Sequence, residues 1–448
     1  MKVDDALHQL HRFPHAILIT IDIQGYPLAV ATEFRVQGRT LTLTPVNTGS
    51  ISPGDTQNAQ VVFSHIHPLP GYGYDERAYI ELTGSLSIGK DDWTFTPHRA
   101  RGWDEKTLPF LELCERALPQ ARRYMRMLSQ ERGEPVGPRM GWGWKLFNAT
   151  RAPFLTATLV PVGLGLAAAA YDGPFSWKLA GLTTVGAIAA HLGINITNDI
   201  FDTRSGADEI NVTPTMFSGG SRVLQYGLLS MSEMSALAGA CYAVAIGSGL
   251  ALVAQSGTGL LGLGVAGLLI GYFYTAPPLR LVHRGLGELA VAAGFGPIMV
   301  LGAYYVQRGH YALWPAVLSI PVAMFVMLIL YANEIPDRIA DARAGKRTLV
   351  VRFSPGTVVK GYATAASAAY GTVAAGTAAG ILPAPTLASL ATIPLAVRVT
   401  RGINRHFDRP YEVMQSLQDN IVLHLSTGAL LIGGVLAARR WGRSRPAA

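Results

Sequence analysis

Cysteine is almost absent from this sequence. Cys114 and Cys241 are the two that occur in 448 residues, one in a polar part of the chain and the other inside an apolar run. Two separated cysteines exclude a disulfide framework and a cysteine-rich metal site. The opening residues, MKVDDALHQLHRF, also lack the apolar core of a signal peptide. We therefore expect the first domain to stay in the cytoplasm.

Charged residues are scarce as well. They make up 15% of the chain, with a formal net charge of +8, and the basic ones lie mainly in short loops between apolar segments. That distribution is typical of membrane proteins and argues against nucleic-acid binding. Long apolar runs start near Pro153. We predict a multidomain chain with a β domain at 1–135, a linker at 136–151 and a membrane domain at 152–440.

The first domain carries β-rich runs across residues 16–45, broken by Gly25 and Gly38, which mark hairpins. Further strands are expected at 59–65 and 78–88. After Pro97 the pattern becomes helical through 111–128, basic on one side and apolar on the other. We expect this amphipathic helix to pack on the barrel, and a position on the membrane surface is the alternative.

The segments AILITIDIQGYPLAVAT, TQNAQVVFSHI and YIELTGSL occur in an order that resembles the split-barrel flavin-binding family, which includes the pyridoxamine phosphate oxidases. The resemblance implies a small β split barrel with FMN as its cofactor. Where family members place a basic phosphate contact, this chain has Thr48, Ser50, Ser52 and Gln57. A cofactor-free binding or regulatory module is therefore the alternative.

His65 and His67 alternate along one predicted strand and so share a face on which they could bind a metal. No third ligand follows nearby, and we expect structural or substrate-contacting histidines instead.

About nine apolar runs, each near the length that crosses a bilayer as a helix, follow the linker. They are 153–171, 177–199, 231–254, 257–276, 286–306, 313–333, 356–380, 381–398 and 420–438. We predict an all-α polytopic bundle of about nine transmembrane helices in the inner (cytoplasmic) membrane. Basic residues fall on alternate loops, which we place in the cytoplasm. These are Lys145, Arg151, Arg204, Arg222, Arg280, Arg284, Lys346, Arg347, Arg401 and Arg405.

Residues 331–352 place acids and bases directly after an apolar run. Asn333, Asp337 and Asp341 recur every four residues, so they share one helix face, and Lys346 and Arg347 follow within two turns. Carboxylates for a hard cation beside bases for an anion indicate a site for a metal-bound phosphate or diphosphate. Pro336 removes a backbone donor here, which predicts a broken or kinked helix end.

A second polar stretch repeats this arrangement at 195–208. Asn195, Asn198, Asp199 and Asp202 lie at helical spacing, and Asp208 comes after Gly206, which can turn the chain back toward them. A third segment, GYFYTAPPLRL, ends a helix at its paired prolines and leaves Tyr272, Tyr274 and Arg280 near the helix mouth. On the predicted topology all three open on the cytoplasmic face, so we expect one shared site.

The motifs NDIFDTRSGAD, YTAPPLRL and DRIADARAGKRT resemble those of the UbiA superfamily of intramembrane prenyltransferases, over residues 140–445. The ending GKRTLVVRF is most similar to the branch that prenylates 1,4-dihydroxy-2-naphthoate for menaquinone. Pro336 departs from that branch, which often has arginine there. The resemblance implies transfer of a polyprenyl group from a prenyl diphosphate to a dihydroxynaphthoate-like aromatic acceptor, with two Mg²⁺ ions.

The resemblance also implies a role for each residue. Asp199, Asp202 and Asp208 would hold one Mg²⁺, and Asp337 with Asp341 the second. Bases would neutralise the leaving diphosphate, namely Arg222, Arg280, Lys346 and Arg347. Asparagines would add neutral contacts, namely Asn195, Asn198 and Asn333. Tyr272 and Tyr274 would line the site of the allylic cation. An ion-coupled transporter with a cytoplasmic ligand-binding domain is the alternative from another class, because intramembrane acids also mark ion sites.

Overall fold

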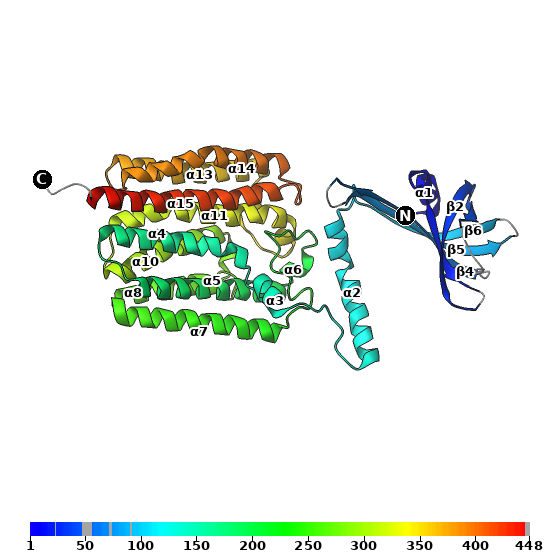
Figure 1. Cartoon of the computed structure of the whole chain (residues 1–448), viewed down its shortest axis with the longest axis horizontal. Coiled ribbons are helices and arrows are strands. Elements are labelled where there is room, and N and C mark those ends of the chain that lie inside the picture. Colours follow the sequence, from blue (N-terminus) through cyan, green and yellow to red (C-terminus); the bar gives the residue numbers. More distant parts are fainter. Residues whose placement is uncertain (23, 47–55, 71–73, 90–91, 444–448) are drawn as a thin grey trace. The chain divides into compact units, whose positions relative to one another are not determined.

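The computed structural model describes residues 1–22, 24–46, 56–70, 74–89 and 92–443. The chain divides into two compact units, Met1–Ala117 and Leu118–Ala448. The first unit is a β domain and the second is a helical bundle (Figure 1).

The β domain is a closed antiparallel barrel with the strand order β1-β2-β3-β6-β5-β4. Its elements are α1 (Val3–Gln9), η1 (Leu10–Arg12), β1 (Ala16–Ile21), β2 (Pro27–Gln37), β3 (Thr40–Pro45), β4 (Thr56–Pro68), β5 (Tyr74–Ile88) and β6 (Trp93–Asp104). Gly25 and Gly38 adopt positive φ between β1, β2 and β3, which confirms the two predicted hairpins.

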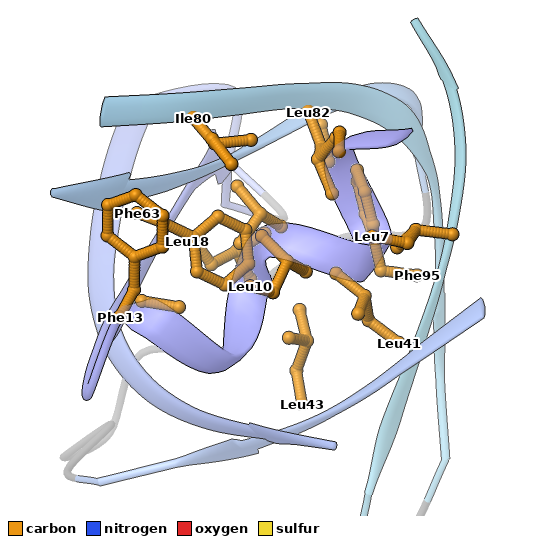
Figure 2. Close-up of a cluster of buried hydrophobic side chains, with 14 of the residues drawn as sticks. Leu7, Leu10, Phe13, Leu18, Leu41, Leu43, Phe63, Ile80, Leu82 and Phe95 are labelled. Atoms are coloured by element: carbon orange, nitrogen blue, oxygen red, sulfur yellow. The ribbon is translucent and has the colours of Figure 1, made fainter. Parts of the chain in front are cut away.

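The barrel is filled by its own N-terminus. In β1 every second residue is buried, as expected of a strand with one face on a core. Figure 2 shows Leu7, Leu10 and Phe13 pointing into the ring of strands, where they meet Leu18, Phe63 and Phe95. The predicted β domain is therefore a closed barrel. That this barrel belongs to the flavin-binding split-barrel family remains a prediction.

The helix predicted through 111–128 is confirmed, although it does not follow Pro97 directly. Pro97 lies inside β6, and the helix α2 (Phe110–Arg132) begins after that strand has ended. Pro97 is opposite Gly84 at a shift in the β5/β6 register. The shift lets a proline sit within a paired strand, because a bulge leaves one backbone donor outside the ladder.

For two groups of barrel residues singled out in the sequence, the expected roles remain predictions. Thr48, Ser50 and Ser52, in the turn where a flavin phosphate was expected, lie outside the described residues, and Gln57 is exposed on β4. His65 is half-buried and His67 exposed on β4. In the described part of the chain they belong to no group of three side chains that could hold a metal.

A salt bridge at the end of the barrel gives a pH-dependent prediction. The Arg77 guanidinium binds Glu105 and lowers the pKa of that carboxyl below its ordinary 4.5. A lowered carboxyl pKa contributes stability above pH 4.5, which is lost as pH falls through the lowered value. For this partly exposed pair we expect E105Q to cost about 1 kcal/mol or less at pH 7 and less than that at pH 3.

Hydrogen exchange of peptides from β5 and β6, compared between wild type and E105Q at each pH, measures that difference. An equal difference at both values would contradict the prediction.

The second unit starts within α2 and continues through α3 (Trp142–Ala149), a short helix inside the segment predicted as a linker. The bundle then consists of η2 (Ala152–Leu155), α4 (Thr156–Asp172), α5 (Trp177–Ser205), α6 (Ala207–Ile210), α7 (Met231–Ser256), α8 (Gly259–Tyr272), η3 (Leu281–Arg284), α9 (Gly287–Ala293), η4 (Gly294–Ile298), α10 (Met299–Arg308), α11 (Leu313–Arg343), α12 (Leu349–Arg352), α13 (Pro355–Ala378), η5 (Ala384–Thr392), α14 (Ile393–His406) and α15 (Met414–Arg443). The long helices lie side by side (Figure 1).

Six helical segments in the described part are long and apolar enough to cross a membrane: Ala152–Asp172, Trp177–Ser205, Met231–Ser256, Gly287–Arg308, Leu313–Arg343 and Met414–Arg439. The chain therefore carries a helical membrane bundle. Each of the nine predicted runs coincides with helix, but α8 is shorter, and α13 and the η5/α14 segment fall outside these six. Nine spans remain a prediction.

The helix predicted to break at Pro336 continues through it. α11 is one helix of 31 residues with Pro321 and Pro336 inside it, and both prolines are buried. A proline costs the helix one hydrogen bond, and here the packing of a buried helix on its neighbours exceeds that loss.

Candidate active site

The two acid clusters meet at the ends of α5 and α11. Lys346 joins them, because its Nζ lies 2.8 Å from Asp202 Oδ2 and 3.6 Å from Asp341 Oδ1. A left-handed Gly345 at the end of α11 turns the chain back, and the Lys346 N–H donates to the Asp341 carbonyl at 2.9 Å. This turn brings the lysine side chain between the two helices.

The segment 211–223 covers both clusters and contributes donors that the sequence did not suggest. Asp337 accepts from Asn211 Nδ2 and from the Gly219 N–H, each at 2.8 Å. Asp199 accepts from the Ser221 N–H at 3.2 Å. One segment thus fixes an acid of α5 and an acid of α11 at once.

Asp208 takes its place through the turn at Gly206, which has φ +77. It lies in α6, it is buried, and it accepts from Gln225 Nε2 at 3.4 Å, while Arg222 donates to its carbonyl. Burial, with the nearby charges of Asp202 and Asp199, raises the pKa of Asp208 well above its ordinary value. All three acids of the first motif therefore lie in one electrostatic environment.

The carboxylates of Asp202 and Asp341 stabilise the charged form of Lys346. Burial by itself would lower the pKa of this ammonium, but the carboxylates of Asp202 and Asp341 raise it above its ordinary value. Lys346 is 8% exposed, so it is a buried, permanently charged cation at the centre of the acids. Such a group suits an anion that binds there.

An apolar cavity of about 580 Å³ starts beside the acids. Asn195 and Asn198 line it from α5, Leu330 from α11, and Tyr274 and Arg151 complete this polar end. Away from this polar end, the cavity is lined by aliphatic side chains such as Leu252, Leu260 and Val306. On α5 and on α11 alike, cavity-lining residues come first and the acids follow at the cytoplasmic end predicted for the helix.

Several predicted residues lie at the edge of this arrangement. Tyr272 is 41% exposed and contacts the Phe201 ring, whereas Tyr274 lines the cavity. Arg280 and Arg347 are exposed, and Asn333 is half-buried. Arg222 is buried and close to Asp208. The structure therefore brings together Asn195, Asn198, Asp199, Asp202, Asp208, Arg222, Tyr274, Asp337, Asp341 and Lys346.

Sequence reasoning missed two buried acids, Glu288 at the start of α9 and Glu334 on α11. It followed the row 333, 337 and 341 along α11. A second row, Leu330, Glu334, Asp337 and Asp341, has equally good helical spacing and would have included Glu334. Glu288 had no comparable signal.

The acids fit a divalent cation that shares its coordination with a phosphate ligand. Among the described residues, Asp199 Oδ1 and Asp202 Oδ1 are buried without a hydrogen-bond partner, and no group of three acidic, histidine or cysteine side chains could hold a metal ion by itself. Mg²⁺ keeps waters and binds one or two carboxylates together with substrate phosphates. Hard oxygen ligands with open positions suit that ion.

Gly220 shows how closely the covering segment approaches the acids. It has φ +74, and a Cβ here would lie 3.1 Å from Asp208 Oδ1 and 3.3 Å from Asp199 Oδ1. We expect G220A to lose about 1–2 kcal/mol of stability from the backbone, and to lose activity beyond that because the carboxylates are displaced.

G227A is the matched control for G220A. Gly227 has φ +67, and its Cβ would meet nothing within 4 Å, so it carries the same backbone cost alone. Thermal unfolding and transfer rates of both variants measure the difference. Equal losses of activity would show that the contact with the carboxylates has no effect.

The sequence profile of the UbiA prenyltransferase family matches residues 158–414. The chain belongs to the UbiA prenyltransferase family. The matched region contains both acid clusters, Lys346 and the cavity lining apart from Arg151, and the β barrel lies outside it. A prenyltransferase is an enzyme, so family membership selects this class over the transporter.

Two known proteins are similar in sequence to this member of the UbiA family. It is 29% identical to a 2-carboxy-1,4-naphthoquinone phytyltransferase of Synechocystis, over 64% of this chain and 91% of the relative. It is 26% identical to the 1,4-dihydroxy-2-naphthoate octaprenyltransferase of Bacillus subtilis, over 70% and 98%. A solved UbiA homologue of Archaeoglobus fulgidus, bound to DMAPP and Mg²⁺, aligns with a TM-score of 0.46 at 17% identity, over 64% and 99%.

Proposed function

We propose that this chain transfers a polyprenyl group from a prenyl diphosphate to a dihydroxynaphthoate-like aromatic acceptor, with Mg²⁺, in the biosynthesis of menaquinone or a related quinone. The observation that carries the proposal is the position of Lys346 between Asp202 and Asp341, beside the polar end of the cavity. It supports a diphosphate at the acids with its apolar chain in the cavity. The naphthoate-type acceptors in the relatives' names support the acceptor class.

In this mechanism the chain's own residues hold and release the diphosphate. Asp199 and Asp202 would hold one Mg²⁺, with Asp208 joining them only after a shift of its side chain, and Asp337 with Asp341 would hold a second. When bound, the ions neutralise phosphate charge and favour departure of the diphosphate. Lys346 and Arg222 add fixed positive charge where negative charge develops, so no reorganisation is needed during the reaction.

The cavity would bind the apolar prenyl chain of the donor. As the bond between C1 and oxygen breaks, its electron pair leaves with the diphosphate, and an allylic cation remains at the polar end of the cavity. Tyr274 presents an electron-rich ring there, and the aliphatic walls exclude water that would otherwise capture the cation. Asn195 and Asn198 would contact the diphosphate from the cavity side, with Asn333 nearby on α11. Arg280, Arg347 and Tyr272 would join only by moving inward.

The setting we propose is an inner membrane with about nine spans and a cytoplasmic β barrel. Basic residues on alternate loops, all placed on the cytoplasmic side, support this topology. For the barrel, the order of its β segments supports an FMN-binding module, with a cofactor-free module as the alternative. Purified full-length protein that is colourless, and stays so after incubation with FMN, would exclude the flavin.

Product analysis tests the proposed activity directly. Purified protein in lipid is incubated with Mg²⁺, a prenyl diphosphate series and several aromatic acids, and products are identified by mass spectrometry. We expect prenylated naphthoate-type products and none when Mg²⁺ is chelated. Transfer to another class of aromatic acid only, or none to any acceptor with the donor intact, would contradict the proposal.

A further inference from the structure

A histidine lies in the wall of the cavity, beyond the two asparagines of its polar end. His191, Asn195 and Asn198 are at i, i+4 and i+7 on α5, so they share one helix face, and all three line the cavity. Four residues of helix place His191 about 6 Å further than Asn195 from the acids of α5. Its side chain is buried. The proposed reaction gives this polar ring no role, although its neighbours in the cavity are mostly aliphatic.

Two neighbouring helices hold the imidazole ring of His191 in place. Its Nδ1 lies 2.6 Å from the hydroxyl Oγ1 of Thr158 on α4, which is fully buried. The ring also packs edge-on against Phe295, with the two ring centroids 5.0 Å apart. A hydrogen bond on one side and an aromatic contact on the other leave the ring little freedom to turn, so the direction of its second nitrogen is fixed as well.

The hydroxyl of Thr158 decides which ring nitrogen carries the proton. Within the described part of the chain, this hydroxyl forms its one hydrogen bond with His191. Its hydrogen therefore points at Nδ1, since any other direction leaves a buried donor without an acceptor, which is the costlier arrangement. Thr158 donates, Nδ1 accepts, and the ring proton of His191 is on Nε2. This assignment follows from the hydrogen-bond network.

The Nε2–H group of His191 is left for a ligand. Nε2 has no hydrogen-bond partner in the described part of the chain, and it is not one of the fully buried polar atoms that lack a partner. It therefore faces open space, which at this position is the cavity. A buried N–H group beside an apolar cavity suits a ligand that brings an oxygen to accept its hydrogen bond.

The aromatic acceptor is the reactant that can supply this oxygen, a step that rests on the proposed function. The prenyl chain is a hydrocarbon and has no hydrogen-bond acceptor. The diphosphate would bind at the acids, and Asp199 is eight residues, or about 12 Å, from His191 along α5. A dihydroxynaphthoate carries hydroxyl and carboxylate oxygens on a ring that has to lie against the prenyl donor. Its far side would then reach along α5 towards His191.

We propose that His191 is a binding residue for the aromatic acceptor, and that its Nε2–H donates a hydrogen bond to a hydroxyl or carboxylate oxygen of that ring. Thr158 is a positioning residue, because it keeps the ring proton on Nε2. The contact orients the acceptor and transfers no proton. The acceptor therefore occupies the cavity between Asn195 and His191, and the specificity of this chain for oxygen-bearing aromatic rings depends in part on one N–H group.

The first experiment separates the two substrates. Full-length protein in lipid vesicles is assayed with 1,4-dihydroxy-2-naphthoate and geranylgeranyl diphosphate. H191L removes the N–H donor, and we expect KM for the acceptor to rise about tenfold, the effect of one lost hydrogen bond. KM for the donor and the slow release of diphosphate without acceptor should stay within twofold of wild type. H191Q keeps an N–H group and should recover part of the loss. H310Q, a change at an exposed histidine outside the cavity lining, is the control.

The second experiment asks whether His191 acts through an oxygen of the acceptor, which a merely structural residue would not do. Two analogues, 1,4-dihydroxynaphthalene without the carboxylate and 1-hydroxy-2-naphthoate without one hydroxyl, compete with labelled acceptor for wild type and for H191L. The analogue that lacks the bound oxygen should bind wild type about tenfold more weakly than the full acceptor does. For H191L the two should bind equally, because both changes remove the same hydrogen bond and their losses do not add. T158V should show a smaller effect of the same kind.

Three results would overturn the inference: an unchanged acceptor KM in H191L, an equal rise of the donor KM, or losses that add for both analogues. Should H191L not fold, the same comparison is made with T158V, where additive losses also overturn it. Failure of the proposed function looks different, because wild type itself would then neither cleave the donor nor prenylate a hydroxynaphthoate.

Discussion

Replacing Asp337 by asparagine is expected to lower prenyl transfer about a thousandfold, the loss found when one preorganised electrostatic contact to a transition state is removed. Asp337 accepts two hydrogen bonds, from Asn211 Nδ2 and the Gly219 N–H. An asparagine has only one acceptor oxygen, so its NH₂ group would face one of these two N–H donors and that hydrogen bond would be lost. The variant therefore loses a carboxylate that we propose to bind Mg²⁺, and it also disturbs the segment that covers the site.

Transfer of labelled prenyl groups, measured over a range of Mg²⁺ concentrations, checks this prediction. D408N is the matched control, since Asp408 forms an exposed ion pair with Arg338 at 2.8 Å, and it should stay within about twofold because such pairs contribute little. The double variant D199N/D337N should be hardly worse than D337N alone, because residues that act as a unit are not additive. Activity of D337N above a tenth of wild type would remove Asp337 from the metal site.

Replacing Lys346 by methionine should damage both stability and activity. The ammonium is buried between Asp202 and Asp341, and methionine would leave two carboxylates without their cation. Breaking a buried pair in this way costs about 3–5 kcal/mol. Transfer should fall as well, because the diphosphate loses a fixed positive charge where its own charge develops.

Mg²⁺ provides a specific check on K346M. A divalent cation at the acids would replace part of the missing charge, so thermal stability of the variant should rise more steeply with Mg²⁺ than that of wild type. K360M, a change at an exposed lysine of α13, should lie within about 0.5 kcal/mol of wild type. If K346M unfolds at the same temperature as wild type in chelator, the lysine does not neutralise the buried acids.

Some parts of the site could be predicted because they depend only on the spacing of residues along one helix. The spacing of Asn195, Asn198, Asp199 and Asp202 gives one helix face whatever the helix packs against, and the same holds for Asp337 and Asp341. Gly25 and Gly38 gave hairpins for an equally local reason, their positive φ. Pro336 misled for the opposite reason, since the packing of α11 outweighed the local preference of proline.

Lys346 and Arg347 show where local information ends. They are neighbours with the same charge, and nothing in their local sequence distinguishes one from the other. The left-handed turn at Gly345 directs Lys346 toward Asp202, which is 144 residues away in the chain, and leaves Arg347 exposed. A contact over that separation depends on how two helices pack, which no window of sequence contains.

By itself the sequence determined a β domain followed by apolar helices, two acid-rich helix faces and a diphosphate-type chemistry, because charge, periodicity and hydrophobicity act over one or two turns. Only the tertiary structure decided that the barrel is closed, that segment 211–223 fixes an acid from each helix, and that Glu288 and Glu334 meet beside the cavity. These features come from residues far apart in the chain, and their positions follow from packing, which brings buried polar groups together where partners can satisfy them.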